Sequence, residues 1–134
     1  KDKKKIYLAD YNRGLFRFDL ENKTLARVAV PADVCAYGID GLYRYKNTLV
    51  AIQNGTRPNR VVQFQLDDAG TAVTEMKLLS ANHPDFDEPT LGLIKKGIFF
   101  FVANSQWNRV NADHSLPPED QMRRPVVLRI DLNE

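Results

Sequence analysis

Residues 40–54 read DGLYRYKNTLVAIQN, and residues 90–104 read TLGLIKKGIFFFVAN. The two stretches align without a gap at a constant offset of 50 residues. Each has an apolar start, a short polar link and an apolar run that ends in Asn. Identity between them is low, so the evidence for a repeat is the shared pattern of polarity. A period of this size is typical of tandem arrays of small structural units.

An alternating segment recurs three times along the chain. The segments read LFRFDL (15–20), VVQFQL (61–66) and VLRIDL (127–132). Apolar residues at every second position predict strands with one apolar face and one mixed face. In this alternation Phe16, Val62 and Leu128 take equivalent places.

The N-terminal residues 6–10 (IYLAD) match the end of the repeated stretch. Asp10 then takes the place of Asn54 and Asn104. We interpret these repeated polar residues, together with Arg13 and Arg60, as scaffold chemistry. Oxygens of Asp or Asn at a strand end accept hydrogen bonds from loop amides, and an arginine can bridge neighbouring units.

Short polar links carrying Gly or Asn separate the predicted strands and suit hairpin turns. The predicted strands are residues 6–10, 15–20, 24–30, 40–45, 48–53, 60–66, 73–79, 90–94, 98–103 and 126–132. Four strands recurring every 45–50 residues or so predict an all-β fold, a β-propeller of four-stranded antiparallel blades. A small β-sandwich or barrel is the alternative.

The predicted blade fragments cover about 5–30, 38–79 and 90–132, roughly two and a half blades. The first fragment opens at a second strand, and the last stops after a third. A closed propeller needs four or more blades. We therefore expect the missing blades to come from the same polypeptide or from another chain.

Two short motifs resemble known propeller families. The segment 6–10 followed by Asn12 and Arg13, and the segment that begins at Asn59, resemble the NHL-type repeat. The step Gly-Ile-Asp-Gly-Leu at 38–42 is similar to the step that opens inner strands in the gluconolactonase (senescence-marker) family. Both families are propellers, and the second is six-bladed.

The second resemblance implies a site and an activity. It implies that Asp40 is a ligand of a catalytic metal, with Ca²⁺ suited to oxygen ligands of this kind. It also implies a metal-dependent hydrolase of lactones or related esters. The equivalent step of the next unit is Thr90-Leu91 instead, and the alternative role of Asp40 is to bond turn amides.

Antiparallel pairing predicts that Asp10, Asp40, Asn54 and Asn104 lie at one end of the sheets. The loop at 82–89 joins them there, whereas the opposite end carries only tight hairpins. Loops on a rigid scaffold carry binding and catalysis, so this end is the candidate functional face.

A long insertion at 105–125 begins at the same end. It contains the only tryptophan, Trp107, and one of two histidines, His114. Loops of this length often act as lids or partner contacts. The alternative is that Trp107 covers a sheet edge.

The loop at 82–89 adds His83 and an acidic cluster of Asp85, Asp87 and Glu88. We predict ligand or partner binding by His83, Asp87, Glu88, Asn54, Asn104, Trp107 and His114. Carboxylates so placed can serve acid–base catalysis, or they can cap backbone donors in the loop.

Composition excludes several classes of function. The net charge of +2 gives no electrostatic basis for nucleic-acid binding. The one basic cluster, at residues 1–5, is expected to be a solvated end. No run approaches the roughly 18 apolar residues of a membrane span. Cys35 is the only cysteine, so zinc-ligand spacing is absent and the cellular compartment stays open.

Three hypotheses remain. The first is a non-catalytic propeller whose loop-rich face binds a protein, peptide, carbohydrate or small molecule. The second is a metal-dependent lactonase or esterase of the gluconolactonase type. The third is an accessory domain of a larger protein. We favour the first, because a fold by itself does not specify chemistry.

Overall fold

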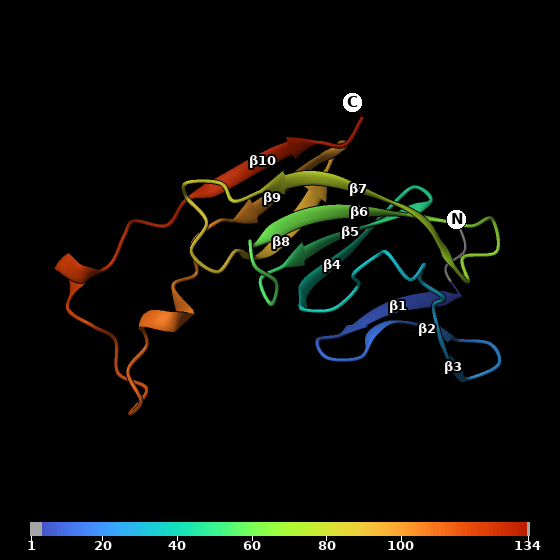
Figure 1. Ribbon diagram of the computed structural model, residues 1–134, viewed down its shortest axis with the longest axis horizontal. Coiled ribbons are helices and arrows are strands. Elements are labelled where there is room, and N and C mark those ends of the chain that lie inside the picture. Colours follow the sequence, from blue (N-terminus) through green and yellow to red (C-terminus); the bar gives the residue numbers. More distant parts are fainter. Residues whose placement is uncertain (1–3, 134) are drawn as a thin grey trace.

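The computed structural model of the protein describes residues 4–133, which form an all-β structure of three antiparallel sheets (Figure 1). The first sheet contains β1 (Lys5–Asp10), β2 (Gly14–Asp19) and β3 (Thr24–Arg27). The second contains β4 (Ile39–Tyr45), β5 (Thr48–Gln53), β6 (Arg60–Leu66) and β7 (Val73–Ala81). The third contains β8 (Thr90–Lys95), β9 (Ile98–Val102) and β10 (Val127–Asp131). Two 3₁₀ helices, η1 (Trp107–Arg109) and η2 (Glu119–Gln121), lie between β9 and β10.

Within each sheet the strands follow chain order, so every pairing is a simple antiparallel neighbour. All ten predicted strands are present, and the all-β prediction is confirmed. The largest difference from the predicted bounds is at β3, which ends at Arg27 rather than at residue 30. After Arg27 the chain leaves the first sheet, because Ala29 pairs in parallel with Ala72 beside β7.

The gapless sequence repeat is also a repeat of strand pairing. Leu42 lies opposite Ala51 as Gly92 lies opposite Phe101, and Tyr45 lies opposite Thr48 as Lys95 lies opposite Ile98. Both hairpins, β4–β5 and β8–β9, carry an irregularity near the start of the first strand. The offset of 50 residues therefore describes two hairpins of the same register.

The three sheets pack face to face around two apolar cores. The first core, between the first and second sheets, contains Leu15, Val28, Leu49, Ala51, Val62 and Phe64. The second core, between the second and third sheets, contains Val50, Ile52, Val61, Phe99, Phe101 and Leu132. Alternate residues of β5 thus enter opposite cores, which explains why this strand is apolar on both faces, while β6 adds Val61 to the second core.

Equivalent positions face the preceding sheet in each unit. Val62 and Phe64 enter the first core, while Leu128 and Ile130 pack against the second core. Among residues 4–133, no sheet lies before the equivalent residues of β2. The resulting first open face consists of Ile6, Leu8, Phe16, Phe18 and Leu25, of which Ile6, Leu8 and Leu25 are 45%, 45% and 59% exposed.

The third sheet presents a second open face on its far side. This face consists of Leu93, Phe100, Val102 and Val127, with Leu93 and Val127 54% and 62% exposed. Exposed apolar surfaces of this kind mark sites that other protein surfaces cover. The stack of sheets is therefore apolar at both of its ends.

The pairing corrects one predicted equivalence. Leu8 lies opposite Phe16, whereas Ala51 lies opposite Val62. Because Phe16 and Val62 are equivalent, Leu8 takes the place of Ala51, and Asp10 takes that of Gln53 rather than of Asn54. The short N-terminal match could not show this shift of one residue.

Only part of the predicted basic end can be described, since Lys1 and Lys3 lie outside the described residues. Lys4 forms an ion pair with Glu21, and Lys5 begins β1.

Candidate functional site

The loop-rich end of the sheets is formed by Asp40, Asn54, Asn104 and the crossover at 82–89. Asn54 joins elements of all three sheets there: its Oδ1 accepts from the Tyr11 hydroxyl (3.0 Å), and its Nδ2 donates to the Pro89 carbonyl (3.2 Å). Asp40 accepts a hydrogen bond from the Thr90 hydroxyl. The structure thus brings residues distant in the sequence together at this end.

Asn104 is buried and holds the returning part of the insertion. Its Oδ1 accepts from the Val126 amide (2.6 Å), and its Nδ2 donates to the Arg124 carbonyl (2.9 Å). Gln106 repeats this pattern with both backbone groups of Arg123, at 2.8 and 3.0 Å. Each side-chain amide thus pairs with a backbone N–H and a backbone carbonyl, as a neighbouring strand would. Asn104 is therefore a scaffold residue of the site. Gln106 was missed because nothing in its sequence context marks it.

The acidic cluster fastens the crossover to the insertion. Asp85 pairs with Arg123 at 2.9 Å, and Asp87 pairs with Arg109 at 3.0 Å. Glu88 accepts from the Asn108 amide at 2.7 Å. These contacts support the alternative in which the carboxylates anchor a loop instead of transferring protons. Hydrogen bonds between a guanidinium group and a carboxylate are charge-assisted and stronger than those between neutral groups.

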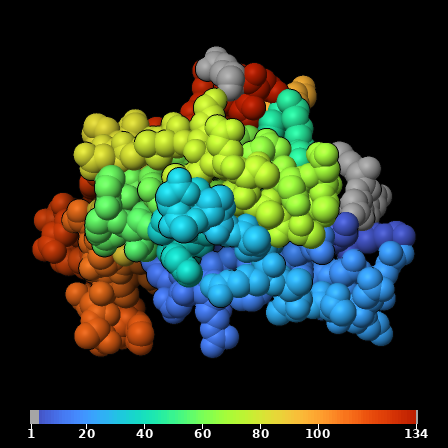
Figure 2. All heavy atoms as spheres, turned by 45° about the vertical axis from the view of Figure 1, so that its right-hand side comes forward, coloured from blue at the N-terminus to red at the C-terminus, as the bar shows by residue number. Residues whose placement is uncertain are grey.

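The insertion projects beyond this anchored base (Figures 1 and 2). Neither η1 nor η2 contributes a buried residue. Trp107 is 69% exposed, and Leu116 is 70% exposed. Trp107 therefore does not cover a sheet edge within the described part of the chain. A cavity of about 610 Å³ lies between the end of β9 and the returning segment, lined by Val102, Asn104, Gln106, Glu119, Met122 and Arg124.

The two histidines occupy different environments. His83 accepts from the Asp85 amide through Nδ1 (3.2 Å), and its ring lies 5.5 Å from that of Phe86. His114 lies at the exposed tip of the insertion with a positive φ of 66°. His83 belongs to the anchored crossover, whereas His114 belongs to the projecting part of the loop.

The predicted metal ligand Asp40 lacks companions. Within residues 4–133 no group of three or more His, Cys, Asp or Glu side chains is arranged to hold a metal ion. Its neighbour Tyr43 receives a hydrogen bond from the Gly92 amide (2.6 Å). Burial raises the pKa of Tyr43 against the opposing effect of the Gly92 amide, and the charge of Asp40 adds to the rise, so this phenol stays protonated. A Ca²⁺ ligand role for Asp40 therefore stays a prediction.

The scaffold interpretation is supported for Asp10, whereas the contact of Arg60 differs from the one expected. The Oδ1 of Asp10 accepts from the amides of Asn12 and Arg13, at 3.0 and 2.8 Å. Arg60, however, donates to Gln53 of its own sheet (2.7 Å) and bridges no sheets through that bond. An arginine that does bridge the first and second sheets is Arg17, which donates to the Ala69 carbonyl (2.9 Å).

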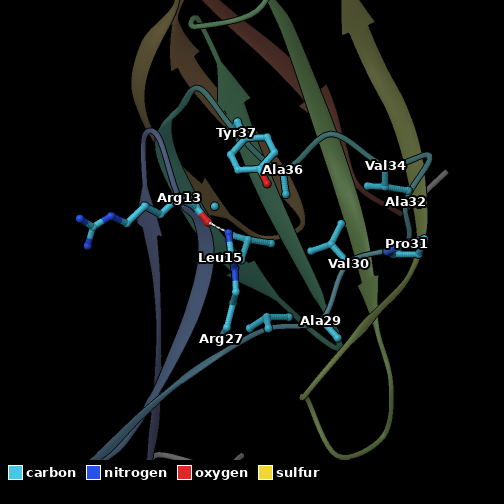
Figure 3. Close-up of a pocket in the computed structure, with 12 residues that line it drawn as sticks. Arg13, Leu15, Arg27, Ala29, Val30, Pro31, Ala32, Val34, Ala36 and Tyr37 are labelled. Carbon is cyan, nitrogen blue, oxygen red and sulfur yellow. Dashed lines mark hydrogen bonds between the residues drawn. The ribbon is translucent and has the colours of Figure 1, made fainter.

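A second cavity was not predicted. We call it the connector pocket. It lies between the start of β2, the end of β3 and the connector at 28–38 (Figure 3).

Comparisons with protein-family models, curated proteins and solved structures gave no match to the chain. The site must therefore be interpreted from its own geometry. Among the residues described, no helix has the length and apolarity needed to cross a bilayer.

Proposed function

We propose that the chain is part of a β-propeller that binds a ligand or partner through its loop-rich end. The stacked sheets support the propeller: equivalent positions of successive units enter successive cores, and both ends of the stack are apolar. Blades packed in this way continue until the ring closes. In this proposal further blades, from the same polypeptide or another chain, cover the two open faces.

The observation that carries the binding function is an exposed tryptophan on an anchored loop. The pairs Asp85–Arg123 and Asp87–Arg109 fix the base of the insertion, while Trp107 stays 69% exposed. Tryptophan is enriched among residues that dominate binding energy. A loop that is already ordered loses less conformational entropy when it binds. The anchors thus prepare Trp107 for contact with a partner.

Replacing Trp107 with alanine tests this proposal. Because the side chain is exposed, we expect the free energy of unfolding to fall by less than about 0.5 kcal/mol. A buried tryptophan would cost about 3–5 kcal/mol instead. We expect binding to weaken at least about tenfold, which corresponds to about 1.4 kcal/mol. The measurement uses the full-length protein on arrays of immobilised peptides and oligosaccharides, with chemical denaturation in parallel.

Leu78→Ala is the matched control, because Leu78 is an exposed apolar residue (54%) on the outer strand β7. Binding that is equal in the Trp107 and Leu78 variants would contradict the proposal. Ca²⁺-dependent hydrolysis of glucono-lactone that disappears in Asp40→Asn would support the hydrolase hypothesis in its place.

A further inference from the structure

The connector pocket is a cavity of about 310 Å³ whose walls belong to the described chain (Figure 3). Its apolar lining includes Leu15, Val28, Val30, Pro31, Val34 and Ala36. It lies between the first and second sheets and not on either open face. The apolar wall of the cavity is therefore set by this chain, whereas Arg27 at its rim also lies opposite Phe16 of the first open face.

A buried glutamine holds the wall of this pocket in place. Gln53 is fully buried, and its Nε2 donates to the carbonyls of Cys35 (3.0 Å) and Tyr37 (2.7 Å). The end of the connector is held as well, because the Gly38 amide donates to the Tyr11 carbonyl at 2.8 Å. Binding sites for small molecules are usually preformed in this manner.

The charged residues that line the pocket are Arg13 and Arg27, and no acidic residue lines it. Figure 3 shows the guanidinium of Arg13 turned away from the cavity and that of Arg27 beside Leu15 on its wall. Arg27 donates through Nη2 to the Arg13 carbonyl, and its guanidinium carbon lies 5.9 Å from the centroid of the Phe16 ring. A guanidinium has five N–H donors, so donors remain for a ligand.

We propose that the connector pocket binds a small carboxylate with an apolar body. The apolar lining would take the body out of water, and Arg27 would receive the carboxylate. Arginine and carboxylate form charge-assisted, frequently paired hydrogen bonds. The cavity is at the lower end of the volumes found for ligand sites, which favours a compact molecule. This site is separate from the loop-rich end and does not rest on the function proposed for Trp107.

Benzoate is the probe, with benzyl alcohol as its uncharged counterpart, titrated into the full chain and followed by amide NMR shifts. We expect benzoate to bind with shifts concentrated at residues 27–37, and benzyl alcohol to bind at least about tenfold more weakly, because it lacks the charge that strengthens a hydrogen bond to a guanidinium. Arg27→Gln should weaken benzoate binding at least about tenfold, whereas Arg129→Gln, which removes an exposed charge on β10, should not.

A second variant separates the pocket from effects on folding. Ala32 is exposed at the pocket and Ala112 is exposed on the insertion, so Ala32→Trp should block benzoate while Ala112→Trp leaves its binding unchanged. The proposal is overturned if benzoate does not bind at about 10 mM, which is a free energy near −2.7 kcal/mol. Equal binding of benzyl alcohol, or binding that survives both Arg27→Gln and Ala32→Trp, would overturn it as well.

Discussion

At the scale of single residues, buried side-chain amides connect parts of the chain that the strands leave apart. Gln53 is buried between the connector and β6. Its Nε2 donates to two backbone carbonyls of the connector, and its Oε1 accepts from the guanidinium of Arg60. A buried polar group costs little only while its hydrogen bonds are made. Gln53 therefore secures both the connector pocket and the end of β5.

Gln53→Leu should lower the free energy of unfolding by about 2–3 kcal/mol, because buried backbone carbonyls lose their donor. Urea denaturation followed by circular dichroism measures this loss. Gln63→Leu is the control: Gln63 is half-buried and bonds the Thr48 hydroxyl (2.9 Å), so its loss should stay below about 1 kcal/mol. Equal losses in the two variants would contradict the role assigned to Gln53.

Glycine has a steric role at one place in the loop-rich end. Gly38 has a positive φ of 64°, and a Cβ there would lie 2.8 Å from the backbone of Gly55. The Gly55 amide donates to the Gly38 carbonyl at 3.1 Å. The Gly-Ile-Asp-Gly step at 38–41 thus includes a glycine required by close backbone approach and by conformation.

At the scale of elements, polar side chains order the turns that join the strands. Asp67, at the turn between β6 and β7, accepts from the amides of Thr71 (2.6 Å) and Ala72 (3.0 Å) and from the Thr71 hydroxyl (2.8 Å). These bonds, chiefly the one from the Thr71 hydroxyl, lower the pKa of Asp67 below its ordinary value of 3.8. Ionised Asp67 therefore stabilises this turn.

This shift predicts a loss of stability in acid. The pKa of Asp67 is lower in the folded state than in the unfolded state, so its contribution is present above the unfolded pKa of about 3.8 and disappears as pH falls through the folded pKa. Asp67→Asn should make the thermal midpoint less dependent on pH below about 4. Asp68→Asn, in the same turn, is the control. If the thermal midpoints of the two variants depend on pH in the same way, the hydrogen bonds of Asp67 are not the cause of the stability loss in acid.

The insertion is the second element whose order depends on polar contacts. Its base is held by Asp85, Asp87 and Glu88, while η1 and η2 contribute nothing to the cores. Segments with few buried apolar contacts open more readily than the sheets they join. The exposed tip is thus held to the rest of the protein by charge-assisted bonds at the base of the insertion, and not by apolar packing.

At the scale of the whole molecule, the open faces determine how the chain behaves in isolation. Both ends of the stack expose apolar side chains, and the outer strands leave unpaired edges. Such surfaces favour association. Residues 1–134 alone should therefore self-associate or unfold readily.

Sedimentation velocity over a range of concentrations tests this expectation. Leu8→Glu combined with Leu93→Glu, one change on each open face, should shift the distribution toward monomer, because a charge opposes burial of the face. Ala112→Glu, on the projecting insertion, should leave the association unchanged. A monomer of the unmodified chain that unfolds cooperatively would contradict the role of the open faces.

The strands and their repeat were determined by the sequence itself. Alternation in segments such as 61–66 is local, and the offset between 40–54 and 90–104 needs no knowledge of distant contacts. Hairpin links likewise depend on neighbouring residues. For these reasons the strand positions and the gathering of Asp40, Asn54 and the 82–89 crossover could be predicted.

Only the tertiary structure decided how these elements use their side chains. The place of Asp10 depends on which residue lies opposite Leu8, and β3 ends early because Ala29 finds a partner in another sheet. Further contacts of this kind are Asp85–Arg123, Asp87–Arg109 and Gln53–Tyr37. These pairs are 38, 22 and 16 residues apart in the sequence. Periodicity within a segment carries no information about such pairs, because they form only when separate elements pack together.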